Sequence, residues 1–351
     1  MSRHDVEVVV VGAGVMGLAG ARSLARAGRD VVLVEQLRIG HDRGSSHGGS
    51  RIFRLSYPEA HWVRLAQAAL PLWRELEAEG GETLVERYGS LDFGDWQPNL
   101  EALSASGVEF EILDGREIAR RFPLEAGSGE TALFQADGGI VRADAALRAL
   151  RGSALAAGAQ VLEETRITSV EQDDAGVVAA GAGVSIRADV VVVTAGAWAR
   201  RLLAPLGVEL EVEPTRETVS YFDVGTDEPL PSVIDFAEGG APGQLGYALT
   251  APGIGLKAGI HHTGARIDPD EPGSPDAGVA GRTAAWVQRR FRGSLPQSRL
   301  ETCLYTNTPD ESFVLERHGR VIVGSACSGH GFKFAPVVGE RLAALTLGED
   351  P

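Results

Sequence analysis

The N-terminal forty residues contain two apolar runs separated by a helical pattern. Val6–Val11 is a valine-rich run that ends at Gly12, and Asp30–Val34 is a second run of the same kind. Such runs are typical of strands buried on both faces of a parallel sheet. Met16–Ala27 has helical spacing, and Gly28 follows as its end. The segment predicts a strand, a helix and a parallel strand.

Later segments repeat both patterns. Helical spacing of apolar residues predicts three further helices, at His61–Glu79, Asp144–Ala157 and Phe334–Leu347. Short apolar or alternating runs predict strands at Gln160–Glu163, Ile167–Glu171, Val190–Val193 and Arg320–Gly324. The return of buried-strand composition indicates that the chain re-enters its first domain.

Residues 212–299 have a different character. We expect short strands here, turns rich in Gly and Pro such as Asp268–Ser274, and one helix near Ala280–Phe291. This composition favours an antiparallel domain inserted into an α/β domain. We therefore predict an α/β protein with a Rossmann-like FAD-binding domain (1–82, 138–211 and 314–351) and an inserted, mainly antiparallel β substrate domain (83–137 and 212–313).

Charge and composition exclude several classes of protein. The chain has 351 residues and a net charge of −15, so its surface repels nucleic acid and anionic lipid. We find no targeting or membrane-spanning segment and expect a cytoplasmic protein. Cys303 and Cys327 are the two cysteines, and their spacing suits neither a disulfide framework nor a zinc site. We expect no metal.

The basic residues are unusually distributed. Of 33 basic residues, only Lys257 and Lys333 are lysines. Because arginine serves almost anywhere on a surface, the two lysines indicate positions that need a compact ammonium or an adjustable pKa. A chance pair and solvated surface residues are the alternatives.

The segment Gly12-Ala-Gly14-Val-Met16-Gly17 lies between the first predicted strand and helix. In this context it is a dinucleotide-binding fingerprint, with glycines for a tight turn, for close approach of the pyrophosphate and for helix–strand packing. Glu35 ends the second strand, where a carboxylate accepts hydrogen bonds from ribose hydroxyls and disfavours the 2′-phosphate of NADP. FAD and NAD both fit the fingerprint.

The next block favours FAD. Residues 44–54 read Gly-Ser-Ser-His-Gly-Gly-Ser-Arg-Ile-Phe-Arg, and such small residues suit a chain that runs beside a flat ring system. This block resembles the monomeric sarcosine oxidase and N-methyltryptophan oxidase family of flavoproteins. Four further features share the resemblance, which extends from Val6 to about Gly348: Arg216, Lys257, Cys303-Leu-Tyr-Thr-Asn-Thr308 and Ser328-Gly-His-Gly-Phe-Lys-Phe334.

The resemblance implies how the cofactor is held. In the family, FAD is attached through its 8α-methyl carbon to a cysteine sulfur, which falls on Cys303; a small buried hydrophobe is the alternative role for a lone cysteine. Ser46 and Gly49 stand where relatives often have histidine and aspartate, so hydrogen bonding near the flavin differs. The implied flavin-side residues are Ser45, His47, Arg51, Gly329, Gly331, Phe332 and Lys333.

The resemblance also implies a substrate site. Arg54 and Lys333 match the pair that binds an amino acid's carboxylate, and Lys257 matches the lysine that assists the reaction with oxygen. His261 and Tyr305 match residues that line the substrate cavity, although a packed or surface histidine is an equal alternative for His261.

The implied function is an FAD-dependent oxidase of secondary amino acids, such as sarcosine or another N-methyl amino acid. It gives an imine, then aldehyde plus amine, and reduces O2 to H2O2. The alternatives are an oxidase of a cyclic imino acid (pipecolate- or proline-like), a biosynthetic amino acid oxidase, an FAD dehydrogenase with another electron acceptor, and a flavin-binding module without activity. The expected partners are the amino acid and O2, and we expect a monomer.

Overall fold

The predicted N-terminal strand–helix–strand unit is present in the computed structural model, which describes residues 2–225, 228–241, 243–293 and 295–349. It consists of β1 (Ser2–Val11), α1 (Val15–Arg26) and β2 (Val31–Val34). β1 is parallel to β2 on one side and to β12 (Val184–Val193) on the other. The buried position of β1 explains its nearly continuous valine run.

Segments far apart in the sequence complete this eight-stranded sheet. β9 (Gln160–Leu162) adds beside β2, and β20 (Val321–Ser325) adds beside β12, both parallel. The predicted return of the chain to its first sheet is therefore confirmed. Antiparallel strands extend this sheet: β10 (Ile167–Asp173), β11 (Gly176–Gly181) and β19 (Val314–His318).

The eight-stranded sheet is covered on both faces. Val8 and Val10 of β1 belong to the core that includes α1, whereas Val9 and Val11 belong to a second core on the opposite face. The first core also contains α2 (Ala60–Gly80), α5 (Ala143–Ala156) and α8 (Ala335–Leu347). The second is covered by α6 (Ala199–Leu203) and η2 (Ala204–Leu206), and η1 (Gly196–Trp198) directly precedes α6.

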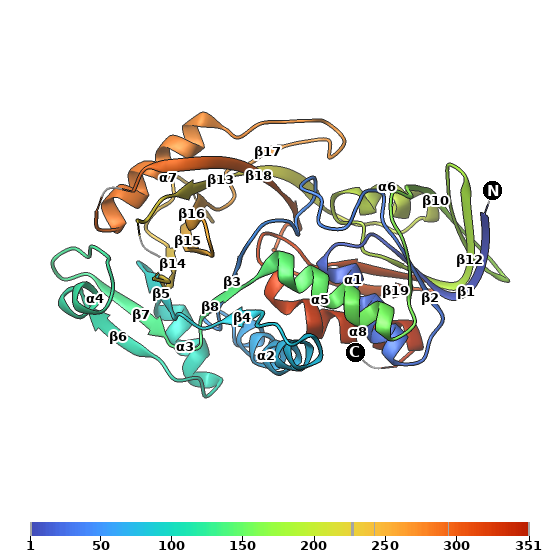
Figure 1. The fold of residues 1–351 in the computed structure, drawn as a ribbon, viewed down its shortest axis with the longest axis horizontal. Helices are drawn as coiled ribbons and strands as arrows, with labels where there is room; N and C mark the ends of the chain where they lie inside the picture. The colour runs from blue at the N-terminus through green and yellow to red at the C-terminus, as the bar shows by residue number, and fades with distance from the viewer. Residues whose placement is uncertain (1, 226–227, 242, 294, 350–351) are drawn as a thin grey trace.

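A nine-stranded sheet lies beside the first along the long axis of the molecule (Figure 1). All its pairings are antiparallel except that of β14 with β5. Its central path is β17 (Ala265–Arg266), β13 (Glu213–Phe222), β16 (Gly255–Ile260), β15 (Gly246–Ala251), β14 (Ser232–Asp235), β5 (Ser90–Phe93), β7 (Thr131–Gln135) and β6 (Glu111–Asp114), and β18 (Gln297–Asn307) pairs with β13.

The expectation of shorter strands in residues 212–299 holds for β14, β15, β16 and β17 but not for β13. β13 has 10 residues and β18 has 11, and they pair from Glu213 opposite Asn307 to Phe222 opposite Gln297. Pairing between β13 and β18 sets the length of both strands. The alternation of hydrophobic and polar residues within one strand does not show this length. The predicted helix is present as α7 (Ala277–Arg290).

A third, smaller sheet and three further helices complete the described fold. A three-stranded sheet contains β3 (Arg51–Phe53), β8 (Gly139–Val141) and β4 (Val85–Glu86). Two helices, α3 (Gln97–Ala105) and α4 (Gly115–Arg121), flank β5–β7, and η3 (Phe332–Phe334) precedes α8.

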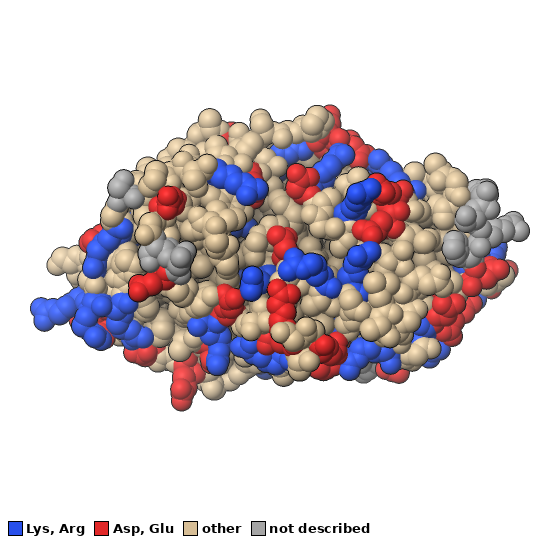
Figure 2. Space-filling view, viewed as in Figure 1, with Lys and Arg blue, Asp and Glu red and all other residues tan. Residues whose placement is uncertain are grey.

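Within the described ranges, no helix combines the length and apolar composition needed to cross a membrane. Charges of both signs are interspersed over the face shown in Figure 2.

Candidate active site

A cavity of about 860 Å³ brings the predicted site residues together. The fingerprint turn, the block at residues 44–54, Lys257, Cys303 and the loop at 326–333 all contribute to its wall. Every predicted site residue lines it except Gly17. Arg216, one of the residues that carry the resemblance, is also outside the lining, and its guanidinium donates to the Glu271 carbonyl.

The fingerprint turn is tightly packed. Gly12 has φ +101°, and a Cβ there would lie 2.7 Å from the carbonyl oxygen of Thr194. A Cβ on Gly17 would lie 1.8 Å from the carbonyl oxygen of Gly12, so Gly17 serves helix–strand packing and not the cavity wall. Thr194, which the sequence did not single out, donates its hydroxyl to the Gly12 carbonyl at 2.9 Å.

Glu35 is fixed as an anion beside this turn. Its carboxylate accepts from the backbone N–H groups of Ala13 at 2.8 Å and Leu37 at 3.0 Å. Burial acts to raise the pKa of Glu35, but hydrogen bonds from His41, Leu37 and Ala13 outweigh it and hold the pKa below its ordinary value. A carboxylate here suits ribose hydroxyls and repels a 2′-phosphate.

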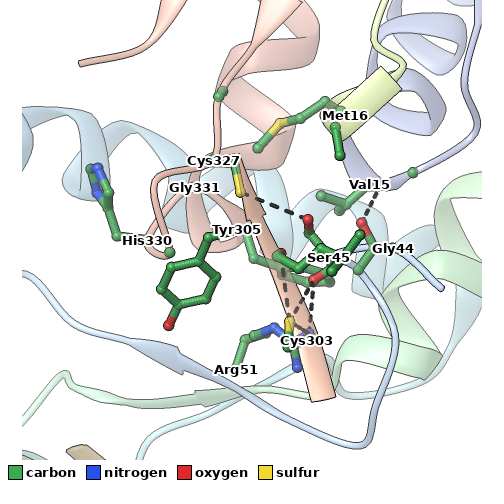
Figure 3. Close-up of a pocket in the computed structure, with 18 of the residues that line it drawn as sticks. Val15, Met16, Gly44, Ser45, Arg51, Cys303, Tyr305, Cys327, His330 and Gly331 are labelled. Atoms are coloured by element: carbon green, nitrogen blue, oxygen red, sulfur yellow. Dashed lines mark hydrogen bonds between the residues drawn. The ribbon is translucent and has the colours of Figure 1, made fainter. Parts of the chain in front are cut away.

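Arg51 organises the loop beside Cys303 (Figure 3). Its Nη2 donates to the carbonyls of Ser45 at 2.8 Å and His47 at 2.6 Å and lies 3.8 Å from Cys303 Sγ. Burial raises the pKa of the Cys303 thiol, while Arg51 and Lys257 act to lower it. Cys327 lies on the other side of Ser45, and its sulfur accepts the backbone N–H of Thr306 at 3.3 Å.

Lys257 lies on β16 with its side chain buried in the cavity wall. Its Nζ donates to the carbonyl of Ser50 at 3.2 Å. Burial, followed by the positive charge of Arg51, lowers the pKa of Lys257 to about 7, and Cys303 and Glu301 act in the opposite direction. A lysine with a pKa near neutrality is typical of a functional position.

His47 is a buried imidazole whose Nε2 atom has no hydrogen-bond partner. Burial, Arg51 and Lys257 lower the pKa of His47 to about 4, so the ring is neutral at physiological pH. An unpartnered polar atom in a cavity wall indicates a ligand or a water as its partner.

Arg54 and Lys333 meet around one aromatic ring. The Arg54 guanidinium carbon lies 4.4 Å from the centre of the Tyr57 ring, and Lys333 Nζ donates to Tyr57 Oη at 2.7 Å. Lys333 also donates to the His330 carbonyl at 2.6 Å. Burial and then Arg54 hold the pKa of Lys333 well below its ordinary value. An anionic ligand between the two cations therefore stabilises the ammonium form of Lys333.

A buried acid behind Arg54 was not found from the sequence. Asp92, in β5, is 1% exposed, and its Oδ1 lies 3.8 Å from Arg54 Nη1. Its Oδ2 accepts from Ser56 and, at 2.8 Å, from Asn99. Burial raises the pKa of Asp92 and Arg54 lowers it, with a raised pKa as the net result. The sequence signal that could have revealed this residue was an acid between two apolar residues, Leu91 and Phe93.

His261 and Tyr305 lie together in the cavity wall, with Nδ1 and Oη 3.3 Å apart. In the described part of the chain, the donor atoms of His261, His262 and Glu311 lie within 4.8 Å of one another. The two imidazole rings stack with centroids 3.9 Å apart and an interplanar angle of 20°. The two ring planes are therefore nearly parallel and separate, so their in-plane lone pairs do not converge on one metal position.

These features fit a flavin dinucleotide. The glycine turn and the N-terminus of α1 supply backbone N–H groups for a pyrophosphate, and Glu35 supplies the ribose acceptor. The cavity continues past the unpartnered His47 to Cys303 and Lys257, where small residues leave room for a flat ring. Fold and site together define an oxidoreductase that uses a flavin dinucleotide.

Comparison with known proteins agrees with this class. Residues 7–345 match the family described as FAD dependent oxidoreductase, and the chain belongs to this family. It is 34% identical to peroxisomal sarcosine oxidase of Mus musculus, over 97% of this chain and 92% of the relative. It is 33% identical to monomeric sarcosine oxidase of Bacillus sp. (strain B-0618), over 99% and 93%. The resemblance inferred from the sequence is confirmed.

Solved structures show the same fold. The open form of NikD, described as an unusual amino acid oxidase essential for nikkomycin biosynthesis, superposes with a TM-score of 0.89. The two chains are 28% identical, and the match covers 99% of this chain and 95% of NikD. The predicted fold class, an α/β protein with a Rossmann-like FAD-binding part, is confirmed.

Proposed function

We propose that this FAD-dependent oxidoreductase oxidises secondary amino acids, with sarcosine or another N-methyl amino acid as substrate and O2 as electron acceptor. The observation that carries the proposal is the pair of cations around Tyr57, formed by Arg54 and Lys333. Full-length similarity to sarcosine oxidases supports the same substrate class.

Arg54 and Lys333 bind the substrate carboxylate and set its orientation. A guanidinium offers a planar fork and an ammonium a point charge, so together they fix one direction of approach. Burial lowers the pKa of His330 to about 3 and holds the pKa of His261 well below its ordinary value. Both imidazoles are neutral, which leaves Arg54 and Lys333 as the anion-binding groups at this end of the cavity.

The cofactor supplies the redox chemistry. Once bound, FAD would supply two-electron redox chemistry: oxidation of the C–H bond beside the substrate nitrogen to give an imine, which water hydrolyses, and return of the two electrons to O2 as H2O2. Lys257 holds a positive charge where oxygen is reduced, which stabilises the negative charge that forms there.

Cys303 is the proposed attachment point of the flavin, through a thioether to the 8α-methyl carbon. Its support is position: the sulfur lies in the cavity wall, 3.8 Å from the Arg51 guanidinium. Arg51 and Lys257 favour the thiolate, which is the reactive form. We also propose that the protein acts as a monomer in the cytoplasm.

Oxygen consumption and peroxide formation test the proposal directly. Purified protein should be yellow and should produce H2O2 with sarcosine or with larger N-methyl amino acids. Activity restricted to pipecolate or proline would shift the assignment to cyclic imino acids. Turnover with a dye but not with O2 would make the protein a dehydrogenase. A colourless protein that FAD does not reconstitute would overturn the flavin assignment.

A further inference from the structure

Tyr221 and Glu301 form a hydrogen-bonded pair on the sheet face that carries Lys257. Tyr221 is 1% exposed, and its hydroxyl donates to Glu301 Oε2 at 2.7 Å. The register of the strands places Tyr221 directly opposite Lys257 on β16 and opposite Arg299 on β18. Neither member of the pair lies in the fingerprint or in the motifs of the flavin-binding block.

Tyr221 and Lys257 converge on Gly48. A Cβ built on Gly48 would lie 3.8 Å from both Lys257 Nζ and Tyr221 Oη, and 3.5 Å from Arg51 Nη1. Lys257 Nζ also lies 6.0 Å from the centre of the Tyr221 ring. The ammonium, the phenol and the guanidinium therefore surround the same stretch of backbone.

Several charged or titratable groups act on Lys257. Arg51 from β3 opposes its charge, while Cys303 and Glu301 from β18 and Asp144 from α5 favour it. His47 faces the same region as a neutral imidazole, and Tyr221 as a phenol. Asp144 is exposed, so solvent screens it.

Glu301 is the acid that the fold holds in place. Its side chain is 19% exposed and is paired with Arg299 from the solvent side as well as with Tyr221 from the interior. Burial and then Glu301 raise the pKa of Tyr221, so the phenol remains a hydrogen-bond donor. The carboxylate is therefore directed toward the interior in one orientation.

We propose that Glu301, oriented by Tyr221, is a positioning residue that keeps Lys257 charged in the cavity wall. The inference rests on the proposed function, because it assigns the charge of Lys257 to the reaction with oxygen. Arg51 and burial both oppose the ammonium, and Glu301 offsets part of their effect. Removal of the Glu301 carboxylate should lower the pKa of Lys257. The pH at which the reaction with oxygen becomes slow should fall in parallel.

The scarcity of lysine makes the test direct. The chain has two lysines, so holoenzyme labelled with [ε-13C]lysine gives two side-chain NMR signals, and Lys257→Arg assigns them. We expect Glu301→Gln to lower the titration midpoint of the Lys257 signal by about one pH unit, the usual effect of removing one nearby charge in a partly buried site. Tyr221→Phe should shift it in the same direction by less, and Glu301→Asp should restore it in part.

Glu316→Gln is the matched control, because it removes an equal charge from an exposed position on β19. It should leave the Lys257 midpoint unchanged. The pH profile of kcat/KM for O2 should shift with the NMR midpoint in each variant. An unchanged Lys257 midpoint in Glu301→Gln, or a shifted midpoint without a shifted oxygen profile, would overturn the inference. Absence of peroxide from the wild-type enzyme would instead overturn the proposed function, and the NMR titration would still measure the coupling between Glu301 and Lys257.

Discussion

Asp92 Oδ1 lies 3.8 Å from Arg54 Nη1, and neither of these two buried atoms makes a hydrogen bond. The acid is the counter-charge of Arg54 when no substrate is present. The guanidinium also lies over Tyr57, so its position does not depend on the acid alone. A substrate carboxylate that approaches Arg54 therefore meets a cation that is already partly neutralised.

Asp92→Asn should separate two effects of this arrangement. Loss of the buried counter-charge leaves Arg54 unpaired, so the free protein should have a lower Tm. A carboxylate ligand would then be the main counter-charge of Arg54, and acetate should bind several-fold more tightly than to wild type. Thermal shift measured with increasing acetate checks both outcomes. Asp95→Asn, at an exposed position of the cavity wall, is the control and should change neither. Weaker acetate binding to Asp92→Asn would contradict the competition between the two carboxylates.

Cys303→Ala should release the flavin on denaturation. Without the sulfur no thioether forms, so acid precipitation should leave the yellow colour in the supernatant, whereas wild type keeps it in the pellet. Cys327→Ala is the control because its sulfur contacts Ser45 and Thr306 in the same region. It should retain colour in the pellet. Release of flavin from wild type would remove the covalent assignment and leave FAD as a bound cofactor.

The cofactor end of the site could be predicted because its signals are local. The fingerprint joins a strand to a helix within a few residues, and Glu35 ends the next strand, so spacing alone places them at one sheet edge. The scarcity of lysine singled out Lys257 and Lys333, and the resemblance assigned roles to them and to Arg54 and Cys303; all four line one cavity. The domain boundaries and the roles of these residues stay predictions.

Asp92, Tyr221 and Glu301 could not be predicted, because strand register determines their contacts. Tyr221 and Glu301 are 80 positions apart in the sequence and meet only because β13 and β18 pair along their full length. Asp92 lies in residues 83–137, where the hydrophobic pattern predicted no element, yet β5, β6 and β7 form there through pairing with one another and with β14. Long-range pairing of this kind leaves little trace in local periodicity.

Lys257→Met should slow the reaction with oxygen by about a hundredfold, the usual effect of removing one group that stabilises developing negative charge. The methionine keeps the length of the side chain but not its charge. Stopped-flow spectroscopy can follow reduction by substrate and reoxidation by O2 separately, and reduction should be nearly unchanged. Equal slowing of both steps would indicate that Lys257 holds the cofactor in place and does not act on oxygen.

The two steps should also depend on pH in opposite directions. A lysine whose pKa is about 7 carries its charge below that pH and loses it above, so kcat/KM for O2 should fall as the pH rises through about 7. Substrate reduction of the enzyme requires the neutral amine and should accelerate over the same interval. Stopped-flow traces from pH 6 to 9 measure both. An oxygen step that is independent of pH in wild type and that equals Lys257→Met would contradict the role of the ammonium.

Gly12→Ala should abolish FAD binding and lower the free energy of unfolding. The backbone angle φ +101° is unfavourable for alanine, and the new Cβ would lie 2.7 Å from the Thr194 carbonyl oxygen, which cannot move without distorting β12. Strain of this kind costs about 1–3 kcal/mol before the clash is added. Gly28→Ala is the control, since φ is +77° but nothing lies within 4 Å of the added carbon. It should lose about 1 kcal/mol and bind FAD normally. Denaturation curves and the flavin-to-protein absorbance ratio measure both quantities, and a Gly12→Ala protein with a full complement of FAD would show that the turn tolerates a side chain.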